Sequence, residues 1–118
     1  MNAKDELLKI VSKLGLKIEK AKIACNLKTE FDDSGNWYYS FEKLLELKKD
    51  YSGFELEMFL SDLDFNYDNG FGSQYLFGFV WFDEGSWLER YEYDGYERWD
   101  YKKTPNWDAL LYREEPEE

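Results

Sequence analysis

Aromatic and β-branched residues dominate three runs in the second half of the chain, and two turn signals separate these runs. The runs lie between Tyr75 and Tyr101. Asp94-Gly95 suits a two-residue hairpin loop, and Glu84-Gly85 offers the same geometry because glycine readily adopts positive φ. The pattern therefore predicts a three-stranded antiparallel meander.

Two-residue loops at both turns also predict which residues share a face of this meander. Trp81 is expected opposite Leu88, Phe79 opposite Arg90, and Arg90 opposite Trp99. One face then holds Tyr75, Phe77, Phe79, Trp81, Leu88, Arg90, Glu92, Glu97, Trp99 and Tyr101. The first run is apolar at almost every position, which is typical of a central strand, whereas the last run is more polar and is expected nearer an edge.

Two segments have the spacing and the terminal signals of helices. Asn2 is a suitable N-cap for a helix over residues 3–14, and Gly15 is a suitable residue to end it in a left-handed conformation. Ser52 and Glu55 form the pattern of a capping box ahead of apolar residues at helical spacing. This predicts a second helix at about 53–63.

The first half of the chain also contains strand signals. Ile23, Cys25, Leu27, Thr29 and Phe31 alternate with more polar residues, which predicts a half-buried strand with Cys25 toward the core. A loop at 32–36 follows. Residues 37–47 fit a second strand paired back on the first, but the part from Phe41 to Lys48 also fits a helical face and has high helix propensity. The sequence leaves both alternatives open at 41–50.

These elements predict one α+β domain spanning residues 1–118. Its antiparallel sheet of four or five strands is expected to be covered on one face by the two helices. A chain of 118 residues is the usual size of a single compact domain. Thr104-Pro105 is expected to open a short helix running through Asp108 and Leu111, and residues 112–118 are expected to form a disordered acidic tail.

The formal net charge of −11 belongs to the second half of the chain. Residues 1–49 contain ten lysines and eight acidic residues, whereas residues 50–118 contain five basic and eighteen acidic residues. An acidic surface of this kind repels phosphates and favours basic proteins as partners. Direct binding to nucleic acid or to an anionic membrane is therefore not expected.

Cys25 is the only cysteine, so the chain forms no internal disulfide and needs no oxidising compartment. The first residues lack the apolar core of a signal peptide, and no apolar run reaches membrane-spanning length. We therefore expect the protein to work in a cytoplasm.

Catalytic and cofactor signals are weak. The chain has no histidine, which removes the commonest general base and the usual partner of a nucleophilic cysteine or serine. The loop at Asp64–Gly70 has the spacing of a calcium loop in part, but its glycine is one position late and Tyr75 stands where a carboxylate is required. A turn held by side-chain hydrogen bonds explains this loop better than a cation site at Asp62, Asp64 and Asp68. We expect no enzymatic activity, no cofactor and no metal.

The meander supplies the candidate binding residues. Its carboxylates alternate with tyrosines, and the expected partner-binding set is Asp83, Glu84, Glu89, Glu92, Asp94, Glu97, Asp100, Tyr91, Tyr93 and Tyr96. Glu92 is expected opposite Glu97, and Glu89 opposite Asp100, which costs stability unless Arg90 and Arg98 relieve the repulsion. Regularly spaced carboxylates on a rigid sheet can imitate the phosphates of a nucleic acid.

Three segments carry a family resemblance: Tyr67–Gly72, Trp81–Arg90 and Glu92–Gly95, with Glu97 and Trp99 following. In these segments the chain resembles a group of small uncharacterised proteins of phages and mobile elements. In size and charge it also resembles small acidic anti-CRISPR and anti-restriction inhibitors. This resemblance implies an inhibitor that binds the basic, nucleic-acid-binding surface of a host defence nuclease in the cytoplasm of a host cell. Such a protein is expected to be a monomer or a homodimer. The alternative function is a non-catalytic interaction or assembly module that forms a homodimer through its aromatic sheet face.

Overall fold

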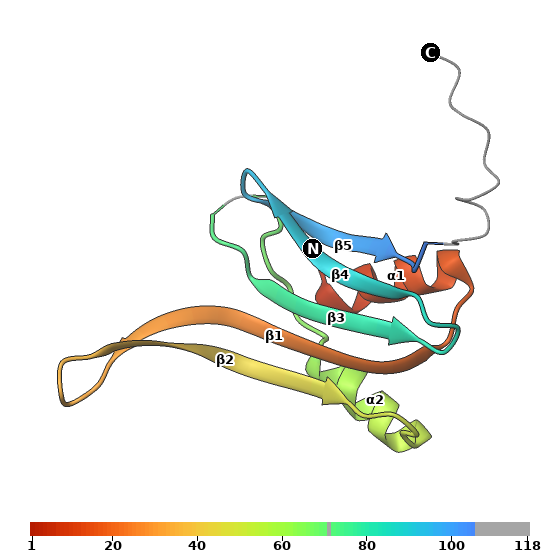
Figure 1. Cartoon of the computed structure of the whole chain (residues 1–118), viewed down its shortest axis with the longest axis horizontal. Coiled ribbons are helices and arrows are strands. Elements are labelled where there is room, and N and C mark those ends of the chain that lie inside the picture. Colours follow the sequence, from red (N-terminus) through yellow and green to blue (C-terminus); the bar gives the residue numbers. More distant parts are fainter. Residues whose placement is uncertain (71, 106–118) are drawn as a thin grey trace, which may run out of the picture.

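The computed structural model describes residues 1–70 and 72–105, which form an α+β fold with two helices and a five-stranded antiparallel sheet (Figure 1). In chain order the elements are α1 (Ala3–Leu14), β1 (Ile18–Phe31), β2 (Trp37–Leu47), α2 (Gly53–Asp62), β3 (Leu76–Phe82), β4 (Trp87–Tyr93) and β5 (Tyr96–Lys102). The expected fold class is confirmed. The expected helix after Thr104 and the expected tail at 112–118 lie outside the described residues.

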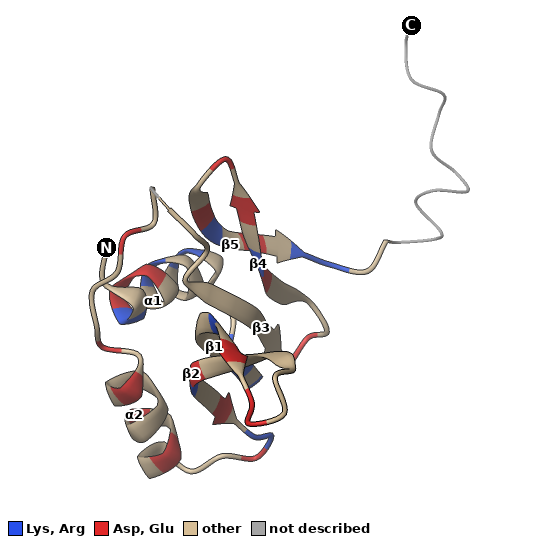
Figure 2. Cartoon of the chain, turned by 90° about the vertical axis from the view of Figure 1, so that its left-hand side faces the viewer, with Lys and Arg blue, Asp and Glu red and all other residues tan. Residues whose placement is uncertain are grey.

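The sheet has the strand order β2-β1-β3-β4-β5, so β3 is central and β2 and β5 are its edges. Both helices pack on the same face of this sheet (Figure 2). The core between them includes Leu7 of α1, Phe59 of α2, Ile23, Val80 and Leu88. Full burial of each such side chain contributes about 1.5–3 kcal/mol to folding. The opposite face of the sheet carries no helix in the described part of the chain.

The helix termini match the capping signals in the sequence. The Asn2 side chain accepts a hydrogen bond from the backbone N–H of Asp5, and Gly15 ends α1 with φ of 66°. Ser52 and Glu55 form a reciprocal capping box at the start of α2. These bonds satisfy amide groups that helix termini otherwise leave unpaired.

Residues 37–47 form a strand, which settles the two alternatives for this segment. Leu45 and Leu47 are buried opposite Ile23 and Ala21 of β1, so the pairing overrides the local helix propensity. Cys25 is fully buried, as its position in the alternation predicts. Beyond Cys25 the two strands continue as a hairpin that extends past the rest of the sheet (Figure 1).

The predicted meander exists, but its first register is wrong by one residue. Trp81 pairs with Trp87 and Val80 with Leu88, because the first turn is a three-residue loop in which the Gly85 N–H donates to the Phe82 carbonyl. A slip of one residue exchanges the two faces of a strand. Leu76, Val80 and Phe82 therefore face the core. The second turn has the expected two residues, with Asp94 and Gly95 both at positive φ.

Candidate protein-interaction surface

Glu97, one of the expected partner-binding residues, lies inside the protein. Its side chain is 1% exposed, and its two carboxylate oxygens accept hydrogen bonds from the backbone N–H groups of Tyr75 and Leu76 at 2.7 and 3.0 Å. The guanidinium of Arg90, also 1% exposed, donates to the same carboxylate at 2.8 Å. Glu97 is therefore a buried structural anion, and its assignment to the binding surface is wrong.

Arg90 connects this carboxylate to the first helix. It donates to Glu6 of α1 at 3.0 Å and to the Tyr67 hydroxyl, which in turn donates to Glu6. The guanidinium also lies over the rings of Tyr67 and Trp99, at 5.5 and 5.0 Å from their centroids. Burial raises the pKa of the Tyr67 hydroxyl, so this group remains a donor at neutral pH. The network joins α1, the loop before β3 and the last two strands.

Two further carboxylates have local partners on the sheet surface. Glu89 lies opposite Asp100, as predicted. Glu89 accepts a hydrogen bond from the Trp87 indole N–H at 2.9 Å, and Asp100 accepts one from Arg98 at 2.7 Å. These contacts relieve the repulsion between the two acids, and their role in binding stays a prediction.

The other expected binding residues separate into two groups. Asp83 and Glu84 lie in the β3–β4 turn, where Glu84 accepts hydrogen bonds from the Ser86 backbone and hydroxyl groups. At the other end of the sheet, the β4–β5 hairpin exposes two carboxylates, Glu92 and Asp94, and three tyrosines, Tyr91, Tyr93 and Tyr96. A hollow of about 410 Å³ at this end is lined by Tyr91, Tyr93, Tyr96, Glu97 and Arg98. The fold thus brings together only half of the expected site.

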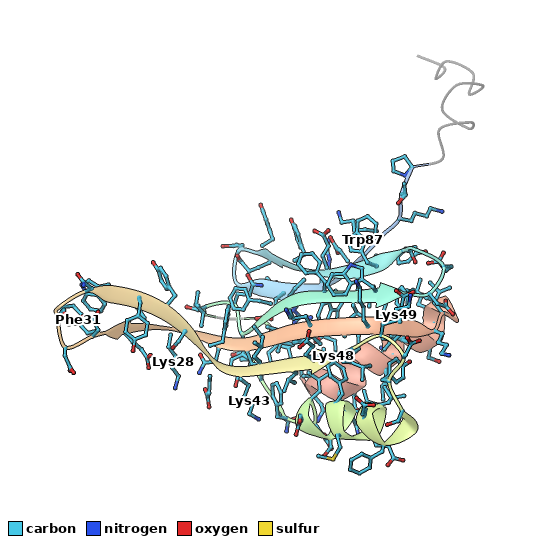
Figure 3. All side chains as sticks on the ribbon, turned by 60° about the horizontal axis from the view of Figure 1, so that its bottom comes forward. Lys28, Phe31, Lys43, Lys48, Lys49 and Trp87 are labelled. Carbon is cyan, nitrogen blue, oxygen red and sulfur yellow. The ribbon has the colours of Figure 1, made fainter. Side chains whose placement is uncertain are left out.

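A second candidate surface is the open face, which we define as the side of the sheet away from the helices. Register places aromatic and aliphatic residues from four strands on it: Leu44 of β2, Phe77, Phe79 and Trp81 of β3, Trp87 and Tyr91 of β4, and Ala24 of β1. Figure 3 shows Trp87 on the side away from both helices. Phe79 stacks with Trp81 at 5.5 Å between ring centroids. Phe41 lies in the part of β2 that extends past the rest of the sheet, and its ring is 5.3 Å from that of Phe77.

The charges on the open face oppose those of the whole chain. The same registers place five cations there, Lys20, Lys22, Lys48, Arg98 and Lys102, and three carboxylates, Glu46, Glu89 and Asp100. Lys20 lies over the Trp81 ring at 4.9 Å from its centroid, and Lys22 pairs with Glu46 at 3.8 Å. The open face is therefore weakly basic although the chain carries a net charge of −11. The sequence analysis expected an aromatic sheet face but missed its basic charge, because Lys20, Lys22 and Lys48 come from other segments than the meander.

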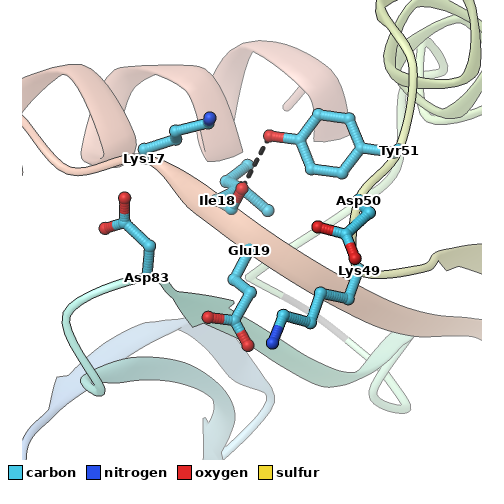
Figure 4. Close-up of a pocket in the computed structure, with 7 residues that line it drawn as sticks. All are labelled: Lys17, Ile18, Glu19, Lys49, Asp50, Tyr51 and Asp83. Atoms are coloured by element: carbon cyan, nitrogen blue, oxygen red, sulfur yellow. Dashed lines mark hydrogen bonds between the residues drawn. The ribbon is translucent and has the colours of Figure 1, made fainter.

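A small hollow lies where the start of β1 meets the connection between β2 and α2. Figure 4 shows a small hollow of about 190 Å³ lined by Lys17, Ile18, Glu19, Lys49, Asp50, Tyr51 and Asp83. Its tyrosine hydroxyl already donates to the Ile18 carbonyl at 2.6 Å, and burial raises the pKa of that hydroxyl. This hollow places mixed surface charges side by side without a nucleophile held by a base, which is the arrangement that nucleophilic catalysis requires.

The calcium-like loop is organised by hydrogen bonds to its carboxylates. Asp64 accepts one from the Asn2 side chain at 2.9 Å and lies 3.5 Å from the Lys4 ammonium, so its pKa is lowered. Asp68 accepts one from the Gly70 backbone at 3.0 Å. Within residues 1–70 and 72–105, no group of three acidic, histidine or cysteine side chains has the geometry to hold a metal ion.

Comparisons with known proteins add no family. No family model matches the chain, and neither a curated protein nor a solved structure matches it. The resemblance to proteins of phages and mobile elements stays a prediction. Among the described helices, none is long and apolar enough to cross a membrane.

Proposed function

We propose that this chain is a non-catalytic binding protein that recognises another protein through the open face. The observation that supports this most is the unequal covering of the sheet. Both helices pack on one face, while the other presents an aromatic cluster at its centre, including Phe79, which is 42% exposed. Exposed apolar patches of this kind are characteristic of interaction sites.

The composition of the open face is that of a protein interface. Aromatic residues and arginine are enriched in the centre of such interfaces, with polar residues around them. Here Phe79 and Trp81 stack at the centre, and Lys20, Lys22 and Asp100 lie around them. Because β3 is held between β1 and β4, these rings are fixed before binding, which lowers the entropic cost of association.

The test is recovery of a partner by the tagged chain from cells that produce it. The substitutions Phe79→Ser and Tyr91→Ser should each weaken binding by about 1–2 kcal/mol, which raises the Kd roughly 5- to 30-fold. Phe54→Ser is the matched control, because Phe54 is 70% exposed on α2. Equal loss of partner in the control and the open-face variants would contradict the proposal.

The same variants test the homodimer expected as the alternative function. Light scattering coupled to size exclusion should give a dimer that survives high salt if the apolar centre of the open face joins two copies. Phe79→Ser should then release monomers and Phe54→Ser should not. If the protein is a monomer at all concentrations, the homodimer is excluded and the partner that binds this face is a different protein.

A second candidate function is inhibition of a nucleic-acid-processing defence effector, such as a host nuclease, through its basic surface. The observation that favours it is the β4–β5 hairpin, where Glu92 and Asp94 lie beside two tyrosines that are 69% and 62% exposed, Tyr93 and Tyr96. Glu92→Gln with Asp94→Asn should slow association and flatten its salt dependence. Unchanged salt dependence in this folded variant would exclude the hairpin as a phosphate mimic.

A further inference from the structure

The β1–β2 hairpin continues beyond the sheet as a two-stranded ribbon, here called the arm and defined as residues 26–42 (Figure 1). β1 pairs with β3 only as far as Cys25, so the arm has no third strand in the described part of the chain. Register places six uncharged residues on one face of the arm: Leu27, Thr29, Phe31, Trp37, Tyr39 and Phe41. A two-stranded hairpin is marginally stable in water unless its apolar face packs against another layer. This face of the arm therefore requires a covering layer.

Asn26 turns this face of the arm to the same side as the open face. Its φ of 57° lies in the left-handed region, which is unusual for a residue other than glycine. Its backbone N–H donates to the Tyr75 carbonyl instead of continuing the pairing with β2. Beyond this point the Phe41 ring lies 5.3 Å from that of Phe77, which register places on the open face. The arm and the open face therefore form one continuous apolar surface.

The arm and the central strand of the open face have matching dimensions. Both carry apolar residues at every second position, as Phe77, Phe79 and Trp81 on β3 and as three cross-strand pairs on the arm. Each set spans four residues along the strand, or about 13 Å at ~3.3 Å per residue. A two-fold axis beside Phe41 and Phe77 would therefore lay the arm of each of two copies along β3 of the other.

The charges at the two ends of this arrangement complement each other. The tip of the arm contains two carboxylates, Asp32 and Asp33, and no basic residue. Next to Trp81 the open face has a hollow of about 250 Å³, lined by one carboxylate and four lysines: Glu46, Lys20, Lys22, Lys48 and Lys49. An arm laid along β3 of a second copy brings its acidic tip past Trp81 to these lysines. Two open faces in direct contact would instead bring their lysines together, which is unfavourable.

The exposed area is sufficient for a stable dimer. Four aromatic side chains of the arm, those of Phe31, Trp37, Tyr39 and Phe41, are 41–73% exposed. Aromatic side chains bury about 150–250 Å² each when fully covered, so these four can bury roughly 450 Å² in each copy. Two arms, with equal areas of open face beneath them, give about 1,800 Å² in total, which is within the ~1,200–2,000 Å² of a stable interface.

From these observations we infer that two copies of this chain form a closed dimer in which the arm of each covers the open face of the other. The inference rests on the proposed function, because it takes the open face as the binding surface and names a second copy as its partner. Each copy uses the same two patches, so the assembly ends at two copies. Figure 3 shows Phe31 near the tip of the arm and Lys48 away from it, beside the helices, so a contact between the tip and the lysines requires a second copy.

The first test is sedimentation equilibrium of the full chain over a range of concentrations. The double substitution Trp37→Ser with Tyr39→Ser should raise the Kd of the dimer at least about 30-fold, because tryptophan and tyrosine carry much of the binding energy of interfaces. Phe79→Ser should also raise it. Tyr38→Ser is the matched control, because Tyr38 lies between these two residues but on the opposite face of the arm and is 45% exposed. It should leave the Kd unchanged.

The second test is a charge reversal across the predicted contact. Asp33→Lys and Lys48→Glu should each weaken the dimer, and the two together in one chain should restore it, because each contact then joins a lysine to a glutamate again. Lys9→Glu on α1 is the control for the second change. Combined with Asp33→Lys, it should not restore the dimer.

Three results would overturn the inference. A wild-type monomer at all concentrations would assign the open face to a different protein. A dimer that is lost in Phe79→Ser but kept in the arm variant would show that open faces meet directly. In both cases the proposed function stands, so the two can fail separately. A dimer that is lost in the arm variant but kept in Phe79→Ser would show that the arms bind each other, and the open face would then have no part in the dimer.

Discussion

Glu97→Gln should destabilise the fold strongly although it removes one of many acidic charges. The carboxylate accepts two backbone N–H groups and the buried Arg90 guanidinium, and glutamine would keep its shape but remove its charge. Removing one partner of a buried ion pair costs about 3–5 kcal/mol. Glu6 still pairs with Arg90 at 3.0 Å, so we expect the lower end of that range, about 3 kcal/mol.

The effect is large relative to the stability of a small domain. The free energy of unfolding of such a domain is about 5–15 kcal/mol. A loss of about 3 kcal/mol by Glu97→Gln should therefore lower the unfolding temperature by roughly 10 °C. Glu92→Gln is the matched control, because Glu92 lies directly opposite Glu97 on the neighbouring strand and is exposed. It should change stability by less than about 0.5 kcal/mol.

The assay is urea unfolding followed by circular dichroism, with both variants and the wild type measured at pH 7. A double-mutant cycle with Arg90→Met should recover a coupling of more than about 1 kcal/mol between Arg90 and Glu97. Equal urea midpoints of unfolding for Glu97→Gln and Glu92→Gln would refute the buried network. Glu97 would then be a surface residue.

Three further predictions concern single features of the fold. Burial raises the pKa of the Cys25 thiol to about 11, so this residue should resist thiol reagents at pH 8 and react only in denaturant; rapid labelling of the folded protein would contradict its burial. Gly78→Ala should cost about 3 kcal/mol in thermal unfolding, because the added Cβ would lie 2.0 Å from the Lys22 carbonyl oxygen; an unchanged melting temperature would contradict this close approach. Stability should be constant from pH 6 to 8, since the chain has no histidine, and should fall below the ordinary carboxyl pKa of about 4. The Asn26 side chain lowers the pKa of Glu42 and that of Asn2 lowers the pKa of Asp64, so both add stability above their unfolded pKa and lose it as pH falls; a decline beginning above pH 6 would contradict this assignment.

The elements of the fold were predictable wherever local signals agreed with the hydrophobic pattern. Asn2 and Gly15 mark the ends of α1, Ser52 and Glu55 mark the start of α2, and Asp94-Gly95 defines one hairpin. In each case the backbone conformation follows from the side chain or from the freedom of glycine. These signals act over a few residues, so the sequence shows them directly.

The register of β3 was not predictable because the strand is apolar on both faces. The hydrophobic pattern can select a strand register only where a shift of one residue would expose apolar side chains or bury polar ones. Phe79 and Val80 are both acceptable in the core, so the length of the loop at 83–85 decided the register. The error exchanged the core and open faces of the central strand.

The candidate site was only partly predictable, because its parts meet through long-range pairing. The alternation places Arg90, Glu97 and Trp99 on one face, and the structure buries them together. A spacing pattern does not show that Glu6 and Tyr67 complete the network and remove Glu97 from the surface. The open face likewise joins residues 20, 48, 81, 87 and 102, which only the strand order brings together.

The most direct test of the central claim is site-specific crosslinking of the open face in cells that produce the protein. A photoreactive phenylalanine derivative would replace Phe79 of the open face in one variant and Phe54 of α2 in another. We predict a single adduct of defined mass from position 79 and none from position 54. Adducts from position 54 alone would contradict the assignment of the open face as the interaction surface.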